Sequence, residues 1–174
     1  MCYYIMATIE SSTSEHSLCD VWTMWAHYPH DNNWTPSGYK LLMNMSTVED
    51  VIVAMHLLPD KFIRQCMLFV MKNPVFPVWE DDHNKHGGSF SYKVPNKVAL
   101  SLWKDLTYAL TGNTLSTNKN VLNDINGITI SPKNNFCIVK IWMKTCTHQN
   151  PSVISDNIRG LTARGCIFKK HDCK

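Results

Sequence analysis

The sequence predicts an α+β domain: a curved antiparallel β-sheet of about 7–8 strands, with about three helices on its convex face. Strand-like segments outnumber helical segments by roughly two to one, and the two kinds alternate irregularly along the chain. So few helical crossovers cannot connect the strands of a doubly wound parallel sheet. With the helices on one face, the other face of the sheet is open, and its loops can converge on a ligand.

The first elements are two strands and a helix. Residues 21–26 alternate β-forming side chains on both faces, and residues 39–45 form a second strand-like run. Ser46 and Glu49 have the spacing of a capping box, in which the Ser hydroxyl and the Glu carboxylate each accept a hydrogen bond from a backbone amide. We therefore expect a helix that runs to about Leu58 and is stopped by Pro59. Its apolar stripe would comprise Val48, Val51, Ile52, Met55 and His56.

The rest of the chain adds a long loop between apolar segments. This loop is rich in proline and carries Trp79, and Gly87-Gly88 then permits a tight turn into a strand. Pro95 opens the following helix and Gly112 stops it. The expected strands lie at 65–72, 89–94, 125–130, 137–143 and 166–170, and the expected helices at 97–110 and 151–163. The helix at 97–110 would bury Leu100, Trp103, Leu106, Tyr108 and Leu110.

Composition places the chain among ordinary globular proteins. Its 174 residues, 44% of them hydrophobic and 18% charged, suit an N-terminal tail at 1–17 and one domain at 18–174. The chain lacks both an apolar run of the ~20 residues that cross a bilayer and a basic leader, so we expect a cytosolic or nuclear protein without membrane contact. Its 7 cysteines form no Cys-x-x-Cys pair and are expected to be free thiols. A net charge of +3 predicts that any contact with nucleic acid is small and local.

Two tryptophans fall where loops are expected. Trp34 lies in a polar segment that leads to Pro36, and Trp79 follows Pro77 and precedes Glu80. A single loop tryptophan most often caps a hydrophobic cluster beneath it. Two loop indoles with an acidic neighbour also suit a flat, electron-poor ligand with hydrogen-bond donors on its edge. Both interpretations are open on these residues alone.

A family resemblance favours the second interpretation. The segment 79–88, Trp-Glu-Asp-Asp-His-Asn-Lys-His-Gly-Gly, resembles the signature of eukaryotic initiation factor 4E, the family that binds the messenger-RNA cap in translation. Further matches in spacing are Trp22, Trp25 and Trp34, then Thr47-Val48-Glu49-Asp50, then Leu102-Trp103 with Gly112, and finally Ile141-Trp142. The resemblance covers residues 16–165, and it implies that 18–174 is a cap-binding domain that recruits mRNA for translation initiation.

The resemblance also implies roles at the base of the cap. Trp34 and Trp79 would sandwich the 7-methylguanine ring, whose positive charge strengthens stacking by a cation–π contribution of ~2 kcal/mol when desolvated. Glu80 would accept from the donors on the Watson–Crick edge of the guanine. Trp142 would touch the methyl group from the side. Trp22, Trp25 and Trp103 instead occupy strand and helix positions that suit structural packing.

On the phosphate side the chain departs from the family. Of the basic positions around the sixth strand of the family only Lys133 keeps its charge, since Asn135 and Ile138 occupy the others. Lys140 lies two residues beyond Ile138, on the same strand face as Trp142, and is a second candidate phosphate ligand. Ser89 stands where the family usually has an arginine. Lys169, Lys170 and His171 are alternative cations, although a charged, frayed terminus is the commoner interpretation of such a segment.

The partner surface implied by the resemblance is altered too. The family binds the helical motif of a scaffold protein with a tryptophan of its first helix and leucines of its second. The corresponding positions here are Ile52, Lys104 and Tyr108. His16, Leu18, Val48 and Asp105 remain plausible contacts, so we expect a scaffold or repressor partner with changed specificity.

Two alternatives stay open beside an initiation factor. One is a translational repressor or decoy that holds the cap without engaging the usual scaffold. The other is an enzyme that uses the cluster Glu80, Asp81, Asp82 and His83, although this cluster lacks metal-ligand spacing and the chain has no nucleophile motif. We therefore expect no catalytic residues, no metal and no cofactor.

Overall fold

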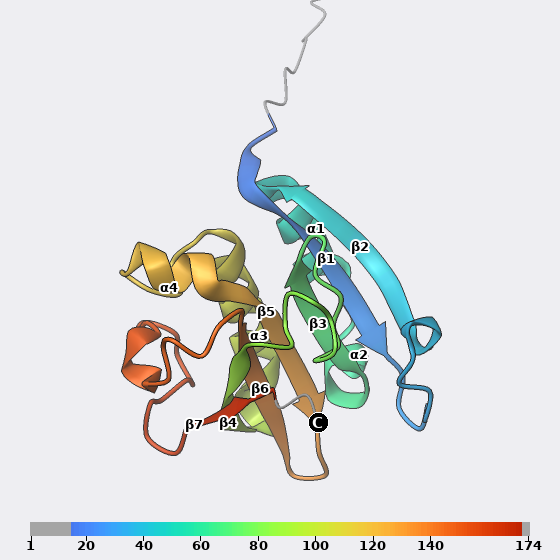
Figure 1. Cartoon of the computed structure of the whole chain (residues 1–174). Coiled ribbons are helices and arrows are strands. Elements are labelled where there is room, and N and C mark those ends of the chain that lie inside the picture. The colour runs from blue at the N-terminus through green and yellow to red at the C-terminus, as the bar shows by residue number, and fades with distance from the viewer. Residues whose placement is uncertain (1–14, 172–174) are drawn as a thin grey trace, which may run out of the picture.

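The computed structural model describes residues 15–171, and its centre is one antiparallel sheet (Figure 1). Neighbouring strands follow the order β2-β1-β3-β5-β6-β4-β7. The strands are β1 (Ser17–His27), β2 (Tyr39–Thr47), β3 (Met67–Lys72), β4 (Gly88–Pro95), β5 (Ile125–Pro132), β6 (Phe136–Met143) and β7 (Ile167–Lys170). The predicted fold class, a curved antiparallel sheet with helices on its convex face, is confirmed. The first residues of the predicted tail, 1–14, lie outside the described residues.

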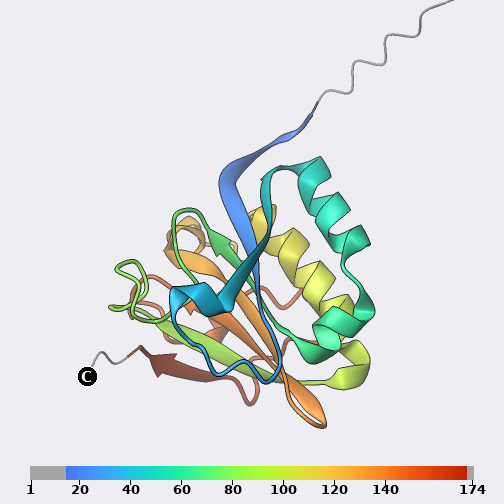
Figure 2. The same cartoon turned by 90° about the vertical axis from the view of Figure 1, so that its right-hand side faces the viewer.

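The helices gather on one side of the sheet (Figure 2). They are α1 (Val48–Leu57), α2 (Asp60–Gln65) and α3 (Asn96–Thr111), with α4 (Lys119–Asp124) before β5 and short 3₁₀ turns at η1 (Pro36–Gly38) and η2 (Pro151–Val153). Neither α2 nor α4 was predicted, because six residues span fewer than two helical turns and show no periodicity. Among residues 15–171, no helix has both the length and the apolar character that a membrane crossing requires.

The start of α1 corrects the predicted capping box by one residue. Thr47, not Ser46, is the N-cap, and its side chain accepts from the Asp50 amide at 3.1 Å. The Asp50 carboxylate in turn accepts from the Thr47 amide at 3.0 Å. The spacing of the box is the same one residue further along the chain, so sequence alone did not separate the two registers. Glu49, released from the cap, binds His16 instead.

The buried stripes of the two long helices also differ in part from prediction. In α1 the buried residues are Val51, Ala54 and Met55, whereas Val48, Ile52 and His56 are exposed. In α3 the predicted Trp103, Leu106 and Leu110 are buried, Leu100 is partly buried, and Tyr108 faces solvent. Spacings of three and four residues define a helix face only once the register against the sheet is known, and tertiary packing sets that register.

The predicted helix at 151–163 is wrong. Only η2 is helical, and Gly160 adopts a φ of 102°, a left-handed conformation that interrupts a helix. Ile154, Ile158 and Leu161 are nevertheless buried in the main core. Their helix-like spacing therefore reflects an irregular segment that packs its apolar side chains onto the domain.

The strands carry one apolar cluster on each face of the sheet. In β3, Leu68 and Val70 belong to the main core beneath the helices, and Phe69 and Met71 belong to a smaller cluster with Trp142. This division follows from the alternation of side chains along a strand. The smaller cluster lies on the face that the helices leave uncovered, and it supports the site described next.

Candidate functional site

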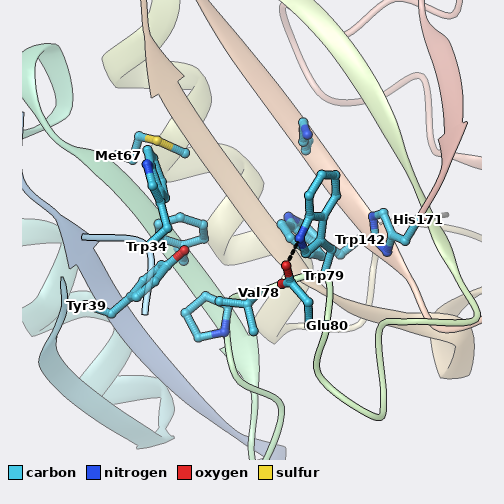
Figure 3. A pocket seen from close by; sticks show the side chains of 11 residues that line it. Trp34, Tyr39, Met67, Val78, Trp79, Glu80, Trp142 and His171 are labelled. Carbon is cyan, nitrogen blue, oxygen red and sulfur yellow. Dashed lines mark hydrogen bonds between the residues drawn. The ribbon is translucent and has the colours of Figure 1, made fainter. Parts of the chain in front are cut away.

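A pocket of about 410 Å³ opens over the smaller apolar cluster (Figure 3). Six residues named as candidates from the sequence line it: Trp34, Trp79, Glu80, Lys140 and Trp142, and also His171, which was named only as an alternative cation. The remaining walls, which were not predicted, are Tyr39, Met67, Phe69, Pro77 and Val78. A pocket of this size, apolar at its base and polar in a few places, is typical of a small-molecule site.

Trp34 stands on the loop between β1 and β2, and its side chain is 55% exposed. One face of its indole stacks on the buried ring of His27, with centroids 4.1 Å apart and planes 4° apart. The loop is held by Asn33, whose side-chain oxygen accepts from the amide and hydroxyl of Thr35. Gly38 ends the loop, where an added Cβ would lie 1.8 Å from the Asn33 carbonyl oxygen. Trp34 is therefore fixed from behind and open on its other face.

Trp79 stands on the loop between β3 and β4, and its side chain is 54% exposed. Figure 3 shows it on the opposite side of the pocket from Trp34. The loop is shaped by buried Asn84, whose side-chain amide donates to the carbonyls of Phe76 at 3.0 Å and Val78 at 2.8 Å. Asn126 in β5 donates to the Asn84 side chain at 2.9 Å. These buried amides join the loop to the sheet.

Trp25 reinforces the same loop, since its ring meets Phe76 edge to face at 5.0 Å. Trp22 and Trp103 lie in the main core beneath the helices. The prediction that these three tryptophans serve packing is therefore confirmed.

Glu80 projects beside Trp79, and its carboxylate accepts a hydrogen bond from the indole nitrogen of that tryptophan (Figure 3). Its charge also reaches Tyr39 across the pocket. Burial, and then the negative charge of Glu80, raise the pKa of Tyr39 to about 12. The carboxylate is thus an exposed acceptor at the rim of an aromatic pocket.

Trp142 in β6 lies beneath the pocket and is 7% exposed. Its indole nitrogen donates to the Thr129 hydroxyl in β5 at 2.7 Å, which fixes the plane of the ring. Gly127, the cross-strand partner of Trp142 in β5, has no room for a side chain, because an added Cβ would lie 2.4 Å from the Val70 carbonyl oxygen. Because Trp142 is almost fully buried, it can offer a ligand only part of its ring.

A group of lysines lies on the side of the pocket formed by β6 and β7. Lys140 lines the pocket, and burial, followed by the charges of Lys169 and Lys133, lowers its pKa. Lys133 is exposed on the β5–β6 hairpin and does not line the pocket. Lys169 pairs with Ser89, which also pairs with Trp142, so the three share one sheet face. The expectation of a frayed end at His171 is wrong, since this residue is buried against the pocket.

The acidic cluster next to Trp79 serves the loop itself. Asp81 accepts from the amides of Phe76 at 3.1 Å and His83 at 2.8 Å. Asp82 pairs with Lys85 at 2.6 Å. Asp81 and Asp82 therefore stabilise the turn of the loop that carries Trp79.

The predicted partner residues lie away from the pocket, on the helical side. Val48, Ile52 and Tyr108 are exposed apolar side chains of α1 and α3. Asp105 is exposed, while Lys104 and Leu18 are partly buried. His16 lies over the start of α1, where it holds the Glu49 carboxylate.

Comparison with known sequences gives a consistent match. A family model described as eukaryotic initiation factor 4E matches residues 17–171. The chain is 28% identical over 113 residues to the eukaryotic translation initiation factor 4E homolog of Acanthamoeba polyphaga mimivirus, covering 57% of this chain and 42% of that protein. It is 30% identical over 123 residues to the eukaryotic translation initiation factor NCBP of Triticum aestivum, covering 69% and 51%. The chain thus spans about half the length of these curated relatives.

Solved structures show the same fold. Schistosome eIF4E complexed with m7GpppG and 4E-BP has a TM-score of 0.69 and 22% identity, covering 77% of this chain and 75% of that one. The complex of C. elegans eIF4E-3 with the 4E-binding protein Mextli has a TM-score of 0.70 and 19% identity, covering 80% and 81%. At such identities the likeness concerns the fold.

Proposed function

Because the chain belongs to the eukaryotic initiation factor 4E family, we propose that it binds the 7-methylguanosine cap of messenger RNA and serves translation initiation. Members of this family are cap-binding factors rather than enzymes, and we assign no catalytic residue, metal or cofactor to this chain. A relative of the same fold was solved with the cap analogue m7GpppG, which is the ligand chemistry we infer here.

One observation carries the proposal: two half-exposed indoles on separate loops face one pocket, with a carboxylate at its rim. Trp34 and Trp79 would clamp the 7-methylguanine ring between their open faces. The ring is cationic, and a cation over indole contributes ~0.5–2 kcal/mol depending on how far water is excluded. Unmethylated guanine is neutral and loses this contribution, so the site would select the methylated base.

Glu80 would recognise the edge of the base. The guanine ring carries two N–H donors side by side, and a carboxylate accepts both. In the free protein the carboxylate is held by the Trp79 indole nitrogen, so binding requires it to exchange that donor for those of the base. Trp142 would contact the ring from the floor of the pocket. The indole nitrogen of Trp142 already donates to Thr129, so this contact with the ligand would be a van der Waals contact and not a hydrogen bond.

Lys140 and Lys133 are the proposed ligands of the phosphates. Lys140 lines the pocket and already feels the charges of two other lysines, so an anion there would relieve their repulsion. Lys133 is further out on the β5–β6 hairpin and would act at longer range, where salt screens its charge.

We place partner binding on the opposite, helical side of the molecule. Two relatives of this fold were solved with 4E-binding proteins, so a scaffold or repressor with a helical motif is the proposed partner class. Its contacts would be His16, Leu18, Val48, Ile52, Lys104, Asp105 and Tyr108. Translation factors act in the cytoplasm, and the proposed location is the cytoplasm together with a nuclear pool. A cap-binding repressor that does not engage the usual scaffold is the second candidate, because Ile52 and Tyr108 change the apolar contacts of this surface.

Retention on an immobilised 7-methylguanosine triphosphate resin tests the proposal. We expect the wild-type protein to elute with free methylated nucleotide and not with plain guanosine triphosphate. Trp34→Ala and Trp79→Ala each remove one stacking face, worth about 1–3 kcal/mol, and should weaken binding of the methylated nucleotide by roughly 5- to 150-fold. If both variants bound as tightly as the wild type, the sandwich would be wrong. If the wild type failed to bind the resin, cap binding itself would be wrong.

A further inference from the structure

His171 lines the pocket, and the base-binding scheme gives it no role, although the sequence offered it as an alternative cation beside Lys169 and Lys170. It directly follows β7, is 8% exposed, and lines the pocket beside Trp142 (Figure 3). Lys140 also lines this pocket. Its ring packs against the Trp142 indole at a tilt of 53°, with centroids 4.9 Å apart. The side chain therefore stands next to Trp142, within reach of the Lys140 charge.

Hydrogen bonds fix which ring nitrogen of His171 faces the pocket. Its Nδ1 lies 2.9 Å from the Asn84 carbonyl oxygen, and a carbonyl can only accept, so Nδ1 carries a hydrogen. The backbone amide of His171 donates to the Gly87 carbonyl at 2.9 Å, which anchors the residue. Nε2, on the other side of the ring, has no hydrogen-bond partner among residues 15–171. In the neutral ring this atom is a bare acceptor, and it becomes a donor only when the ring is protonated.

The charges around His171 favour an anion. Lys140 faces it from β6, Lys169 and Lys170 precede it in β7, and Glu80 is the acid among the pocket's lining residues. Burial is the largest effect and lowers the pKa of His171. The hydrogen bond to Asn84 raises this pKa and the charge of Lys140 lowers it, so the pKa lies below its ordinary value. Within the described part of the chain, no salt bridge neutralises Lys133, Lys140 or Lys169. The free site is thus a neutral imidazole among unneutralised ammonium groups.

We propose that His171 is a ligand of the cap's phosphate chain, its protonated Nε2 donating to a phosphate oxygen that Lys140 also contacts. The inference rests on the proposed function and adds to it a cation that directly follows β7, on a phosphate side where Ser89, Asn135 and Ile138 carry no positive charge. Because Nε2 must gain a proton to donate, binding of the phosphates takes up one proton. The affinity for the phosphorylated cap therefore rises as the pH falls through the range in which free His171 is neutral.

A purely structural role for His171 makes a different prediction. If the ring only ties the Trp79 loop to β7 through Asn84, its loss would disturb the stacked base itself. Binding of a ligand without phosphates would then weaken together with binding of the cap. A phosphate ligand, in contrast, leaves base binding unchanged.

The experiment uses two ligands and compares His171→Gln with the wild type. The ligands are 7-methylguanosine, which has no phosphate, and the dinucleotide cap m7GpppG, whose bridging phosphates do not titrate near neutral pH. Affinities are measured by tryptophan fluorescence from about pH 6 to about pH 8, a range that spans the ordinary histidine pKa. His56→Gln, which changes an exposed histidine of α1, is the matched control.

We expect His171→Gln to weaken the dinucleotide cap by about tenfold at the acidic end and by little at the basic end, as loss of a charge-assisted hydrogen bond predicts. The nucleoside should bind both proteins equally, and His56→Gln should follow the wild type with both ligands. Equal cap affinities of His171→Gln and wild type at every pH would overturn the inference while leaving cap binding intact. Equal losses for nucleoside and cap would assign His171 to the loop instead.

A second measurement needs no variant. Calorimetric titration of wild-type protein with m7GpppG in two buffers of different ionisation enthalpy reports the number of protons exchanged. We expect net uptake with the dinucleotide beyond any exchange seen with the nucleoside, and equal exchange for the two ligands would overturn the inference. If the wild type bound neither ligand, the proposed function and this inference would fail together.

Discussion

The imidazole of His27 lies parallel to the indole of Trp34, with ring centroids 4.1 Å apart and planes 4° apart. His27 is buried at the end of β1, and its Nε2 donates to the Asn33 carbonyl at 3.0 Å. The same residue thus holds the back of Trp34 and the loop that carries it. Because one indole face is covered from inside the protein, the ligand can use only the other.

His27 does not line the pocket, yet His27→Ala should weaken binding of 7-methylguanosine because it removes the ring that supports Trp34. The parallel contact is worth ~0.5–1.5 kcal/mol, which corresponds to a loss of roughly 2- to 12-fold in affinity. Fluorescence titration with the nucleoside measures it. His27→Phe keeps a flat ring behind Trp34 but loses the hydrogen bond to Asn33. Its affinity for the nucleoside should therefore lie between those of the wild type and of His27→Ala. An alanine variant with wild-type affinity and an unchanged melting temperature would show that Trp34 needs no support from behind.

Glu80→Gln tests recognition of the base edge. The amide keeps one acceptor oxygen but loses the charge, and a charge-assisted hydrogen bond contributes about 1.5–3 kcal/mol. We expect affinity for 7-methylguanosine triphosphate to fall by roughly 10- to 150-fold, with a smaller preference over plain guanosine triphosphate, because the carboxylate also attracts the cationic ring. Competition titrations measure both quantities. Asp82→Asn changes a neighbouring exposed carboxylate that pairs with Lys85, and it should behave as wild type. An unchanged preference in Glu80→Gln would place edge recognition elsewhere.

The capping box of α1 offers a test of stability. Asp50→Ala removes an acceptor for the amides of Ser46 and Thr47, and loss of a cap costs ~0.5–2 kcal/mol. For a domain of this size that should lower the melting temperature by about 2–4 °C per kcal/mol. Ser46→Ala is the matched control, because the Ser46 hydroxyl makes only a 3.2 Å contact with Asp50. A larger loss in Ser46→Ala than in Asp50→Ala would restore the register predicted from sequence.

The same helix start shows what the sequence could and could not predict. Helix existence follows from a local pattern, so α1 and α3 were predicted close to their observed bounds. The cap register was not, because Ser46/Glu49 and Thr47/Asp50 satisfy the same spacing and only contacts made in the folded protein, such as that of Glu49 with His16, separate them. The false helix at 151–163 arose in a similar way, since the spacing of Ile154, Ile158 and Leu161 suits a helix but is used by irregular chain.

At the site, the candidates named from the sequence are residues with a strong local signal, and their role in binding stays a prediction. Trp34, Trp79 and Glu80 stand in loops where a large ring or an acid next to it is unusual, and the structure brings them to one pocket. Tyr39 and Phe69 were missed because strand aromatics are ordinary core residues until the sheet faces are assigned. His27 was missed for the same reason, and nothing local indicates that it lies behind Trp34.

The contact between His16 and Glu49 predicts a pH dependence. The His16 imidazole and then its backbone amide, at 2.7 and 3.0 Å from the two carboxylate oxygens, lower the pKa of Glu49 to about 2. The folded value lies below the unfolded one. The stabilising contribution of this contact is therefore fully present above the ordinary carboxyl pKa, and it is lost as the pH falls toward about 2.

Carbon-13 NMR of the Glu49 carboxyl group measures this directly. In the wild type its titration midpoint should lie well below that of an ordinary glutamate, which is about 4.3. His16→Ala keeps the backbone amide but removes the imidazole, so the midpoint should move most of the way back. A midpoint that is unaffected by His16→Ala would mean that the imidazole does not hold the carboxylate in solution.

The helical side of the molecule yields the last prediction, on partner choice. Ile52 is 51% exposed on α1, at the position where the resemblance to the family places a tryptophan. An indole buries more apolar area than an isoleucine side chain and can donate a hydrogen bond to a peptide carbonyl. On α3 the corresponding leucine positions are Lys104 and Tyr108, which remove further apolar contact. We therefore expect the helical motif of an ordinary scaffold protein to bind this chain poorly in a calorimetric titration.

Ile52→Trp should recover part of that binding. Aromatic anchors at an interface are commonly worth at least ~2 kcal/mol, so a gain of about tenfold or more in peptide affinity is expected. Val53→Trp is the matched control, because Val53 is also exposed on α1 but points about 100° further round the helix. Cap affinity should not change in either variant, since α1 lies on the opposite face of the sheet from the pocket. Normal affinity of the wild type for the scaffold peptide would show that Ile52 suffices and would favour an ordinary initiation factor. Equal gains in both tryptophan variants would show only that a larger apolar surface attracts the peptide.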